Sequence, residues 1–242
     1  MSREKEERML NRLKDPTESH DETNDIVNFI NSTIKSGNTV WLVTDWHLWR
    51  RDKKGVSRCH KRAEFNTILN NIKEAVKDND LLINLGDLVD GEFTDKEELK
   101  NELLSLGKKM ILVRGNNDLF DKRFYKSCGF KYVVDSFVWK DILFSHMPTK
   151  NDNTLNIHGH IHGYRTYWIP YQNHIDVAAY DGRIKPVKLK SIISKQKEYA
   201  KTIKEDPSHF NEYAKYQNDS ELIFMSAMLS LDKMYVPDPF ED

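Results

Sequence analysis

The chain has 242 residues, of which 38% are hydrophobic and 31% are charged, so it can form one sizeable core. Its formal net charge of −1 argues against a general nucleic-acid coat, although a local basic patch could attract phosphate. The cysteines, Cys59 and Cys128, are too few for a disulfide framework, so any metal must be held by other residues. No apolar run approaches the roughly 20 residues that span a bilayer, and the first ten residues lack the apolar centre of a signal peptide. We therefore expect a cytoplasmic protein that does not contact membranes.

The first half of the chain predicts helices that alternate with short strands. Residues 1–24, rich in Glu, Lys and Arg, are expected to form a helical arm. Apolar residues then recur at helical spacing over 26–34, 65–76 and 99–106, and apolar runs follow at 40–43, 81–85 and 110–113. This alternation predicts an α/β sheet with both faces covered, in which the carboxyl ends of the strands share one edge.

The second half predicts another sheet and then more helices. Short apolar segments at 133–134, 137–139, 142–144, 155–157 and 175–178 are typical of strands. Candidate helices follow at 191–204, 208–216 and 220–232. We expect a helical arm at 1–24, a catalytic domain at 25–190 and a helical extension at 191–242 that caps the site or forms a homodimer.

Polar side chains that suit metal ions follow the predicted strands. The groups are Asp45-Trp46-His47, Gly86-Asp87-Leu88-Val89-Asp90, Gly115-Asn116-Asn117-Asp118, His146, and Gly159-His160-Ile161-His162. Carboxylate, imidazole and amide ligands suit ions such as Mn, Fe, Ni or Zn, and a carboxylate can bridge two ions about 3.5–4 Å apart. Asp87 is the candidate bridge. Alternation along an extended segment would place both imidazoles of His160 and His162 on one face, so that each serves one ion.

The ordered set D-x-H, G-D-x-x-D, G-N-x-D, a lone His and G-H-x-H resembles the calcineurin-like metallophosphoesterase superfamily over residues 39–189. Within it, residues 174–189 resemble the small bacterial and phage phosphoesterases. The resemblance implies a four-layer αββα sandwich of two mixed sheets flanked by helices, and two divalent ions, with Mn first and Fe, Ni, Zn or Mg as alternatives. It also implies that one ion is held by Asp45, His47, Asp87 and His162, and the other by Asp87, Asn116, His146 and His160.

One position departs from the family pattern. The usual third motif is G-N-H-D, whose His stabilises phosphate and protonates the leaving group, and here that His is replaced by Asn117. An amide can donate a hydrogen bond to a phosphoryl oxygen but cannot supply a proton, so general-acid catalysis worth about 10²–10⁴-fold is absent or relocated. His158 is the candidate substitute acid, because alternation would place it on the face of His160. Asp118 is expected, from the resemblance, to orient its neighbours instead of binding metal.

Two further features bear on the substrate. A run of basic residues lies between Arg50 and Arg62, and we expect Arg50 and Arg58 to bind substrate phosphates, with a solvated surface loop as the alternative. Aromatic residues near the motifs could stack a base, although packing in a sheet or on the surface of a hairpin is the favoured explanation. They are Trp46, Trp49, Tyr164, Tyr167, Trp168 and Tyr171.

The sequence thus favours a phosphodiesterase that acts on a nucleotide or short nucleic acid, in which hydroxide generated between two ions attacks phosphorus. The alternatives are a phosphomonoesterase of proteins or small molecules, and a non-catalytic metal-binding scaffold.

Overall fold

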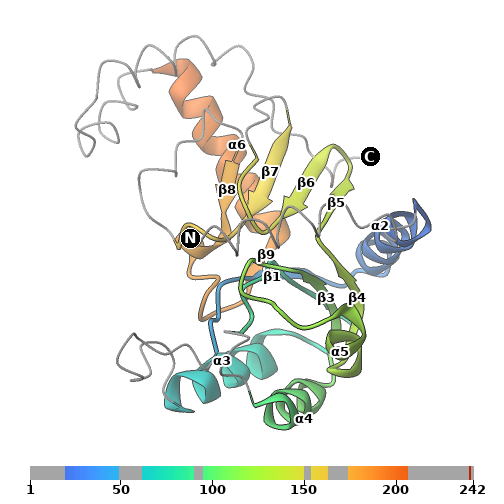
Figure 1. Ribbon diagram of the computed structural model, residues 1–242. Helices are drawn as coiled ribbons and strands as arrows, with labels where there is room; N and C mark the ends of the chain where they lie inside the picture. Colours follow the sequence, from blue (N-terminus) through green and yellow to red (C-terminus); the bar gives the residue numbers. More distant parts are fainter. Residues whose placement is uncertain are drawn as a thin grey trace.

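The computed structural model describes residues 20–48, 62–89, 95–149, 154–162, 174–206 and 240 (Figure 1). These residues form two mixed β-sheets with flanking helices, which confirms the predicted fold class. Sheet 1 has the strand order β4-β3-β2-β1-β9 and sheet 2 the order β5-β6-β7-β8. The strands are β1 (Val40–Val43), β2 (Leu81–Asn84), β3 (Lys109–Val113), β4 (Phe130–Val134), β5 (Ser136–Trp139), β6 (Ile142–Ser145), β7 (Leu155–His158), β8 (His174–Asp176) and β9 (Val187–Lys188).

Sheet 1 is the parallel sheet that the helix and strand alternation predicts. Strands β1 to β4 pair in parallel, and β9 adds an antiparallel edge beside β1. Successive residues enter two different cores, as the alternation of side chains along a strand requires. Leu81 and Ile83 of β2 pack into a core shared with sheet 2, whereas Leu82 packs under helices. Burial of both faces explains why these strands are almost wholly apolar.

Three helices cover one face of sheet 1 in Figure 1: α3 (Arg62–Ala75), α4 (Lys96–Leu106) and α5 (Lys122–Ser127). The ends of α4 show why it stops where it does. The Asp95 side chain accepts a hydrogen bond from the Glu98 amide at 3.0 Å, and Gly107 adopts a left-handed φ of 60° at the carboxyl end. The short helix α5 was not predicted, because its six residues carry too little apolar periodicity.

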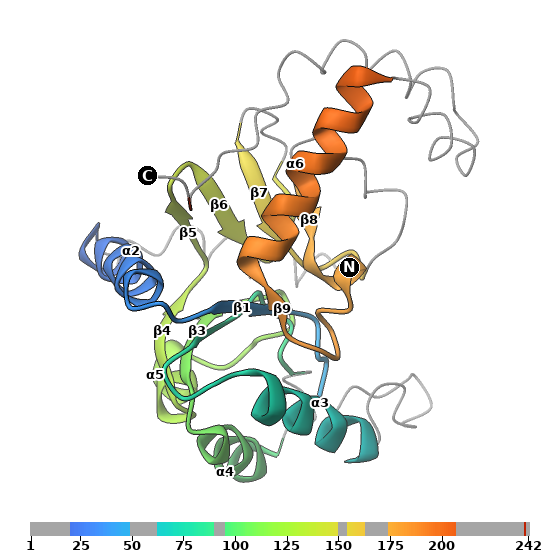
Figure 2. The same cartoon turned by 180° about the vertical axis from the view of Figure 1, so that it is seen from behind.

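Sheet 2 shares the other core with sheet 1 and with α2 (His20–Lys35) and α6 (Leu189–Glu205). The rings of Phe137 and Phe144 stack there with centroids 4.7 Å apart. Helix α6 runs beside β7 and β8 in both views (Figures 1 and 2), and Ile192 and Ile193 at its beginning are buried in this core. The first turns of α6 are thus part of the core, although the sequence placed them in a separate extension.

Local differences from the predictions have simple causes. Helix α2 begins at His20, inside the expected arm, and residues Val177–Tyr180 form a 3₁₀ helix where a strand was expected. Strand β9 has two residues and carries no periodic signal of its own. The candidate helices 208–216 and 220–232 lie outside the described residues. Within the described part of the chain, no helix is long and apolar enough to cross a membrane.

Candidate metal centre

The carboxyl ends of β1, β2 and β3 lie side by side, and the segments after β6 and β7 meet them. The pairing of β1 and β2 continues past the strands, since the Asp45 amide donates to the Gly86 carbonyl at 2.9 Å and the His47 amide to the Asp87 carbonyl at 2.8 Å. Glycine is required where the segments touch. A Cβ on Gly115 would collide with the Asp87 carboxylate, and one on Gly159 with the Thr44 hydroxyl and the Asp45 carboxylate.

Asp45, His47 and His162 form the first group of side chains that could hold a metal ion. Asp45 Oδ1 lies 3.2 Å from His162 Nε2 and 3.7 Å from His47 Nε2. The Nε2 atoms of the two histidines are themselves 2.8 Å apart. Asp45 is held from behind, because its Oδ2 accepts from the Thr44 hydroxyl at 2.7 Å and from the His160 amide at 2.9 Å. Its Oδ1 and both imidazoles therefore converge on one point.

Asp87, His146 and His160 form the second group, and Asn116 joins it. His146 Nε2 lies 3.3 Å from Asp87 Oδ1, 3.1 Å from Asn116 Oδ1 and 3.3 Å from His160 Nδ1. The opposite ring nitrogen, Nδ1, lies 2.7 Å from the Leu85 carbonyl, to which it can only donate. This contact fixes the orientation of the ring, so that Nε2 faces the other members of the group.

Asp87 lies between the two groups. Its Oδ1 faces His146 Nε2 at 3.3 Å, and its Oδ2 faces His47 Nε2 at 3.5 Å. Asn117 fixes this carboxylate, since its backbone amide donates to Oδ1 at 2.9 Å and its side-chain amide to Oδ2 at 2.6 Å. One side chain thus presents a different oxygen to each group, which is the arrangement that a bridging ligand needs.

Five of these side chains extend from residues with left-handed backbone. The φ angles are 53° at Asp45, 47° at His47, 52° at Asp87, 71° at His160 and 55° at His162. Such angles are uncommon outside glycine and concentrate at functional sites. The sequence predicted an extended segment from His160 to His162, and these angles show that this prediction was wrong. The two imidazoles nevertheless belong to different groups.

The charges at the site favour a cation. Burial opposes the imidazolium form of His146, but the carboxylates of Asp87 and Asp45 and the Leu85 carbonyl outweigh it and raise its pKa to about 10. Burial likewise opposes ionisation of Asp87, yet His146 and His47 lower the pKa of this carboxyl to about 2. The pKa of Asp45 is also held well below its usual value, against the effect of burial, by His162 and His47. The buried carboxylates of Asp45 and Asp87 therefore stabilise positive charge, and the residues of both groups fit divalent metal ions.

Comparison with known proteins agrees with this geometry. The profile of the calcineurin-like phosphoesterases matches residues 39–223, which is most of the chain. The chain belongs to the calcineurin-like phosphoesterase family. Members of this family are metal-dependent phosphoester hydrolases.

Two solved structures show weaker similarity to this phosphoesterase. A protein of unknown function from Aquifex aeolicus, AQ665, is 24% identical, with a TM-score of 0.49 over 64% of this chain and 97% of its own. The nuclease MPE from Pseudomonas putida is 20% identical, with a TM-score of 0.38 over 51% of this chain and 61% of its own. At these values neither structure bears on the activity of the phosphoesterase. No curated protein matches the chain significantly.

Asp118 of the phosphoesterase ties two ligand segments together. Its Oδ2 accepts from the Gly115 amide at 2.7 Å, and its Oδ1 accepts from the amides of Leu88 and Val89 at 3.0 and 3.3 Å. The side chain is fully buried, and it belongs to neither metal-binding group. Burial and the charge of Asp87 raise its pKa to about 6, against these hydrogen bonds. Its position is that of an anchor for the residues after β2 and β3.

His158 is placed differently from the expectation. Strand β7 ends at this residue, so alternation does not continue to His160, and His158 belongs to neither metal-binding group. The side chain is fully buried, and its Nδ1 lies 2.8 Å from the Gly159 carbonyl. Burial lowers its pKa to about 3. A neutral imidazole with so low a pKa is poorly suited to donate a proton at neutral pH.

The substrate-binding candidates Arg50 and Arg58 lie outside the described residues, as do Asp90, Trp49 and the aromatic residues between 164 and 171. The structure does reveal a basic residue that the sequence did not single out. Arg183 Nε lies 3.3 Å from the Asp45 carbonyl, and the neighbouring Gly182 carbonyl accepts from the Thr44 amide at 2.9 Å. The segment before β9 reaches the metal centre because β9 runs antiparallel to β1. The sequence could have indicated the position of Arg183 only through β9, and this two-residue strand carries no periodic pattern.

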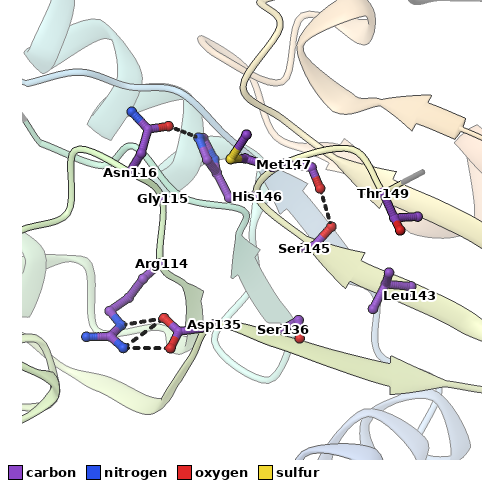
Figure 3. Close-up of a pocket in the computed structure, with 10 residues that line it drawn as sticks. All are labelled: Arg114, Gly115, Asn116, Asp135, Ser136, Leu143, Ser145, His146, Met147 and Thr149. Atoms are coloured by element: carbon purple, nitrogen blue, oxygen red, sulfur yellow. Dashed lines mark hydrogen bonds and ion pairs between the residues drawn. The ribbon is translucent and has the colours of Figure 1, made fainter. Parts of the chain in front are cut away.

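A cavity of about 260 Å³ adjoins the second metal-binding group (Figure 3). Asn116 and His146 form part of its wall, together with Arg114, Ser136 and Leu143. The remaining lining residues are Gly115, Asp135, Ser145, Met147 and Thr149. The cavity thus lies where the end of β3 meets sheet 2.

Proposed function

We propose that the chain is a phosphodiesterase with two divalent metal ions and that its substrate is a nucleotide or a short nucleic acid. The observation that carries this proposal is the position of Asp87, which presents one oxygen to His47 and the other to His146. Asp45, His47, Asp87 and His162 would hold one ion, and Asp87, Asn116, His146 and His160 the other. Mn is the metal that we would test first.

The residues of the chain divide the work around these ions. When bound, two divalent ions lower the pKa of a shared water towards neutrality and neutralise phosphoryl oxygens. Asn117 holds Asp87 in place through both carboxylate oxygens. The Leu85 carbonyl orients His146, and the His160 amide orients Asp45. Ligands fixed in this way keep the reacting groups in register without reorganisation.

Two features support a diester over a monoester. Where other family members have a histidine that protonates the leaving group, this chain has Asn117. The side chain of Asn117 already donates to Asp87, and an amide cannot protonate the leaving group. A diester also carries a second organic substituent that must be accommodated beside the phosphate. The cavity beside Asn116 and His146 offers such space. Arg50, Arg58 and Arg183 are candidates for contacts with further phosphates.

Hydrolysis of bis-p-nitrophenyl phosphate by metal-stripped protein, with and without added Mn, tests the proposal. We expect activity to return with Mn, to exceed the activity on p-nitrophenyl phosphate, and to disappear in Asp87→Ala. Stronger activity on the monoester would overturn the diesterase and favour a phosphomonoesterase. Bound Mn without hydrolysis of either reagent would favour a scaffold.

A further inference from the structure

The cavity beside the metal centre combines apolar and polar lining residues. Leu143 and Met147 line it from β6 and the residues that follow β6, and Arg114 and Ser136 line it from the residues after β3 and the start of β5 (Figure 3). Leu143 lies on the face of sheet 2 that is opposite to the Phe137 and Phe144 rings in the core. An occupant would therefore meet apolar surface at Leu143 and Met147, and hydrogen-bonding groups at Arg114 and Ser136, with Ser145 and Thr149 also in the lining.

The polar part of the lining carries no net charge. Arg114 Nε donates to Asp135 Oδ1 at 2.9 Å and Arg114 Nη2 to Asp135 Oδ2 at 2.8 Å, and both side chains are largely buried. The pair compensates the positive charge of Arg114, so the cavity is not built to attract a second phosphate. These two bonds use Nε and Nη2 and hold the guanidinium in a fixed direction, and among the described residues no acceptor faces the N–H groups of Nη1. The chemistry suits a neutral group that accepts hydrogen bonds.

The walls of the cavity are held by a buried side chain behind them. Asn156 of β7 is fully buried, and its amide nitrogen donates to the Ser145 hydroxyl at 2.9 Å and to the Leu143 carbonyl at 3.1 Å. Its amide oxygen accepts from the Thr149 backbone at 2.9 Å. The Ser145 hydroxyl in turn donates to the Met147 carbonyl at 2.6 Å. This network fixes the segment between Ser145 and Thr149, so the cavity is preformed.

The volume sets the size of the occupant. At about 260 Å³ the cavity is slightly smaller than the roughly 300–1,000 Å³ of most small-molecule sites. It can take a single ring-bearing substituent and is too small for a folded peptide segment. Its position beside Asn116 and His146 places such a substituent next to the phosphate of a bound diester.

We propose that this cavity binds the nucleoside substituent of the phosphodiester, with the base against Leu143 and Met147 and a carbonyl edge of the base towards Arg114. The inference rests on the proposed diesterase function and names the part of the substrate that determines specificity. Leu143 and Arg114 are then specificity-determining residues.

The test compares two ligands that share a phosphate and differ in the substituent. Binding of thymidine 5′-monophosphate and of methyl phosphate to the Mn-loaded protein would be measured by calorimetry. We expect the nucleotide to bind at least about tenfold more tightly, as one well-filled apolar pocket allows. Leu143→Phe, which fills the cavity, should remove most of this preference.

The matched control is Val138→Phe. Val138 is the cross-strand partner of Leu143 on the same face of sheet 2, is 47% exposed and does not line the cavity. We expect this variant to keep the wild-type preference. Leu143→Ala is a milder second variant, in which the preference should fall about threefold to tenfold through lost contact. Melting temperature and Mn stoichiometry check that each variant is folded.

Kinetics with thymidine 5′-p-nitrophenyl phosphate and methyl p-nitrophenyl phosphate separate this inference from the proposed function. Hydrolysis of both esters at equal efficiency, with no preference in binding, would overturn the nucleoside pocket and leave the diesterase intact. A binding preference that Leu143→Phe removes, without hydrolysis of either ester, would support the pocket and overturn the diesterase. Equal losses for both ligands in Leu143→Phe would assign the effect to the metal centre and contradict the pocket.

Discussion

Sheet 1 presents its metal-binding candidates from the ends of parallel strands that are buried on both faces, whereas sheet 2 presents imidazoles from segments that follow β6 and β7. The carboxylates and the amide of the site come from sheet 1, together with one imidazole, that of His47. His146, His160 and His162 come from sheet 2. The sheet 1 carboxylates are fixed by backbone amides, as the contact of Asp45 with the His160 amide shows. The two sheets meet only when both have folded, so the centre depends on their packing.

The largest test of this comparison removes one candidate ligand from each sheet. Asp45→Asn and His146→Gln should each reduce bound Mn from two ions to one and lower diesterase activity at least about 100-fold. Mutation of a residue that only hydrogen-bonds to a metal ligand already lowers metal affinity or activity roughly 10–100-fold. Metal analysis and steady-state kinetics provide the measurements. Asp78→Asn is the control, because Asp78 is exposed at the opposite end of β2. Two ions retained in either variant would contradict the ligand assignment.

The next test concerns the anchor under sheet 1. Asp118→Asn should lower the free energy of unfolding by about 2–3 kcal/mol, because an NH2 group replaces one of the two buried oxygens that accept from three backbone amides and would face a buried N–H from which it cannot accept. Urea unfolding measures the change. Asp121→Asn serves as the control, since Asp121 caps α5 at the surface and asparagine caps a helix equally well. An equal effect in both variants would argue against an anchoring role.

The corresponding test in sheet 2 is Asn156→Leu, which keeps the volume but leaves the Thr149 amide without its acceptor. We expect a loss of about 2 kcal/mol in the free energy of unfolding. Val138→Thr, on the exposed part of the same face, should change it by less than about 0.5 kcal/mol. If Asn156→Leu were as stable as the wild type, the hydrogen bonds of Asn156 would make no net contribution to the stability of the protein.

The smallest effect is expected at the end of sheet 1 that is remote from the metals. Burial opposes ionisation of Asp80, but the amides of Thr39 and Lys77 and the Trp41 indole donate to it and lower its pKa. A lowered folded-state pKa stabilises the protein above the unfolded value, near 3.8, and the stabilisation is lost as pH falls through the folded value. Asp80→Asn should therefore be less stable at pH 7 by about 1 kcal/mol.

The pH dependence makes this prediction specific. The difference between the wild type and Asp80→Asn should shrink as the pH is lowered below about 4, where the wild-type carboxyl takes up its proton. Thermal unfolding at several pH values measures it. A difference that does not change with pH would mean that shape, and not charge, accounts for the role of Asp80.

The comparison also shows which parts of the molecule the sequence could predict. Strands β1, β2 and β3 of sheet 1 were predicted to within one residue at each end, because burial on both faces makes them continuous apolar runs. Strand β4 begins three residues before the expected 133–134 and belongs to sheet 1 instead of the second sheet, and β9 was not predicted. The positions of Asp45, Asp87 and Asn116 at one edge followed from parallel pairing. In sheet 2, Asn156 and His158 are fully buried, although polar residues of these types are usually expected at the surface. Local sequence cannot reveal burial that depends on hydrogen bonds to distant segments.

Other features were beyond reach for a related reason. The sequence motif places His160 and His162 two residues apart, but it does not show their left-handed backbone or their contacts with Asp45, which is more than 100 residues earlier in the chain. The Arg114 and Asp135 pair joins residues 21 apart, and neither belongs to a motif. The cavity beside them is created by the packing of one sheet against the other. Tertiary contacts of this kind leave no periodic pattern.

The left-handed backbone at Asp45, His47, Asp87, His160 and His162 sets selection for stability against selection for catalysis. Each such residue costs roughly 1–2 kcal/mol relative to a right-handed conformation, a cost that glycine avoids. Glycine at any of these positions would relieve the cost and delete a candidate ligand at the same time. A family member that had lost its metal ions would be free to acquire glycine at these five positions, and drift towards glycine there would mark the loss of chemistry in an otherwise intact fold.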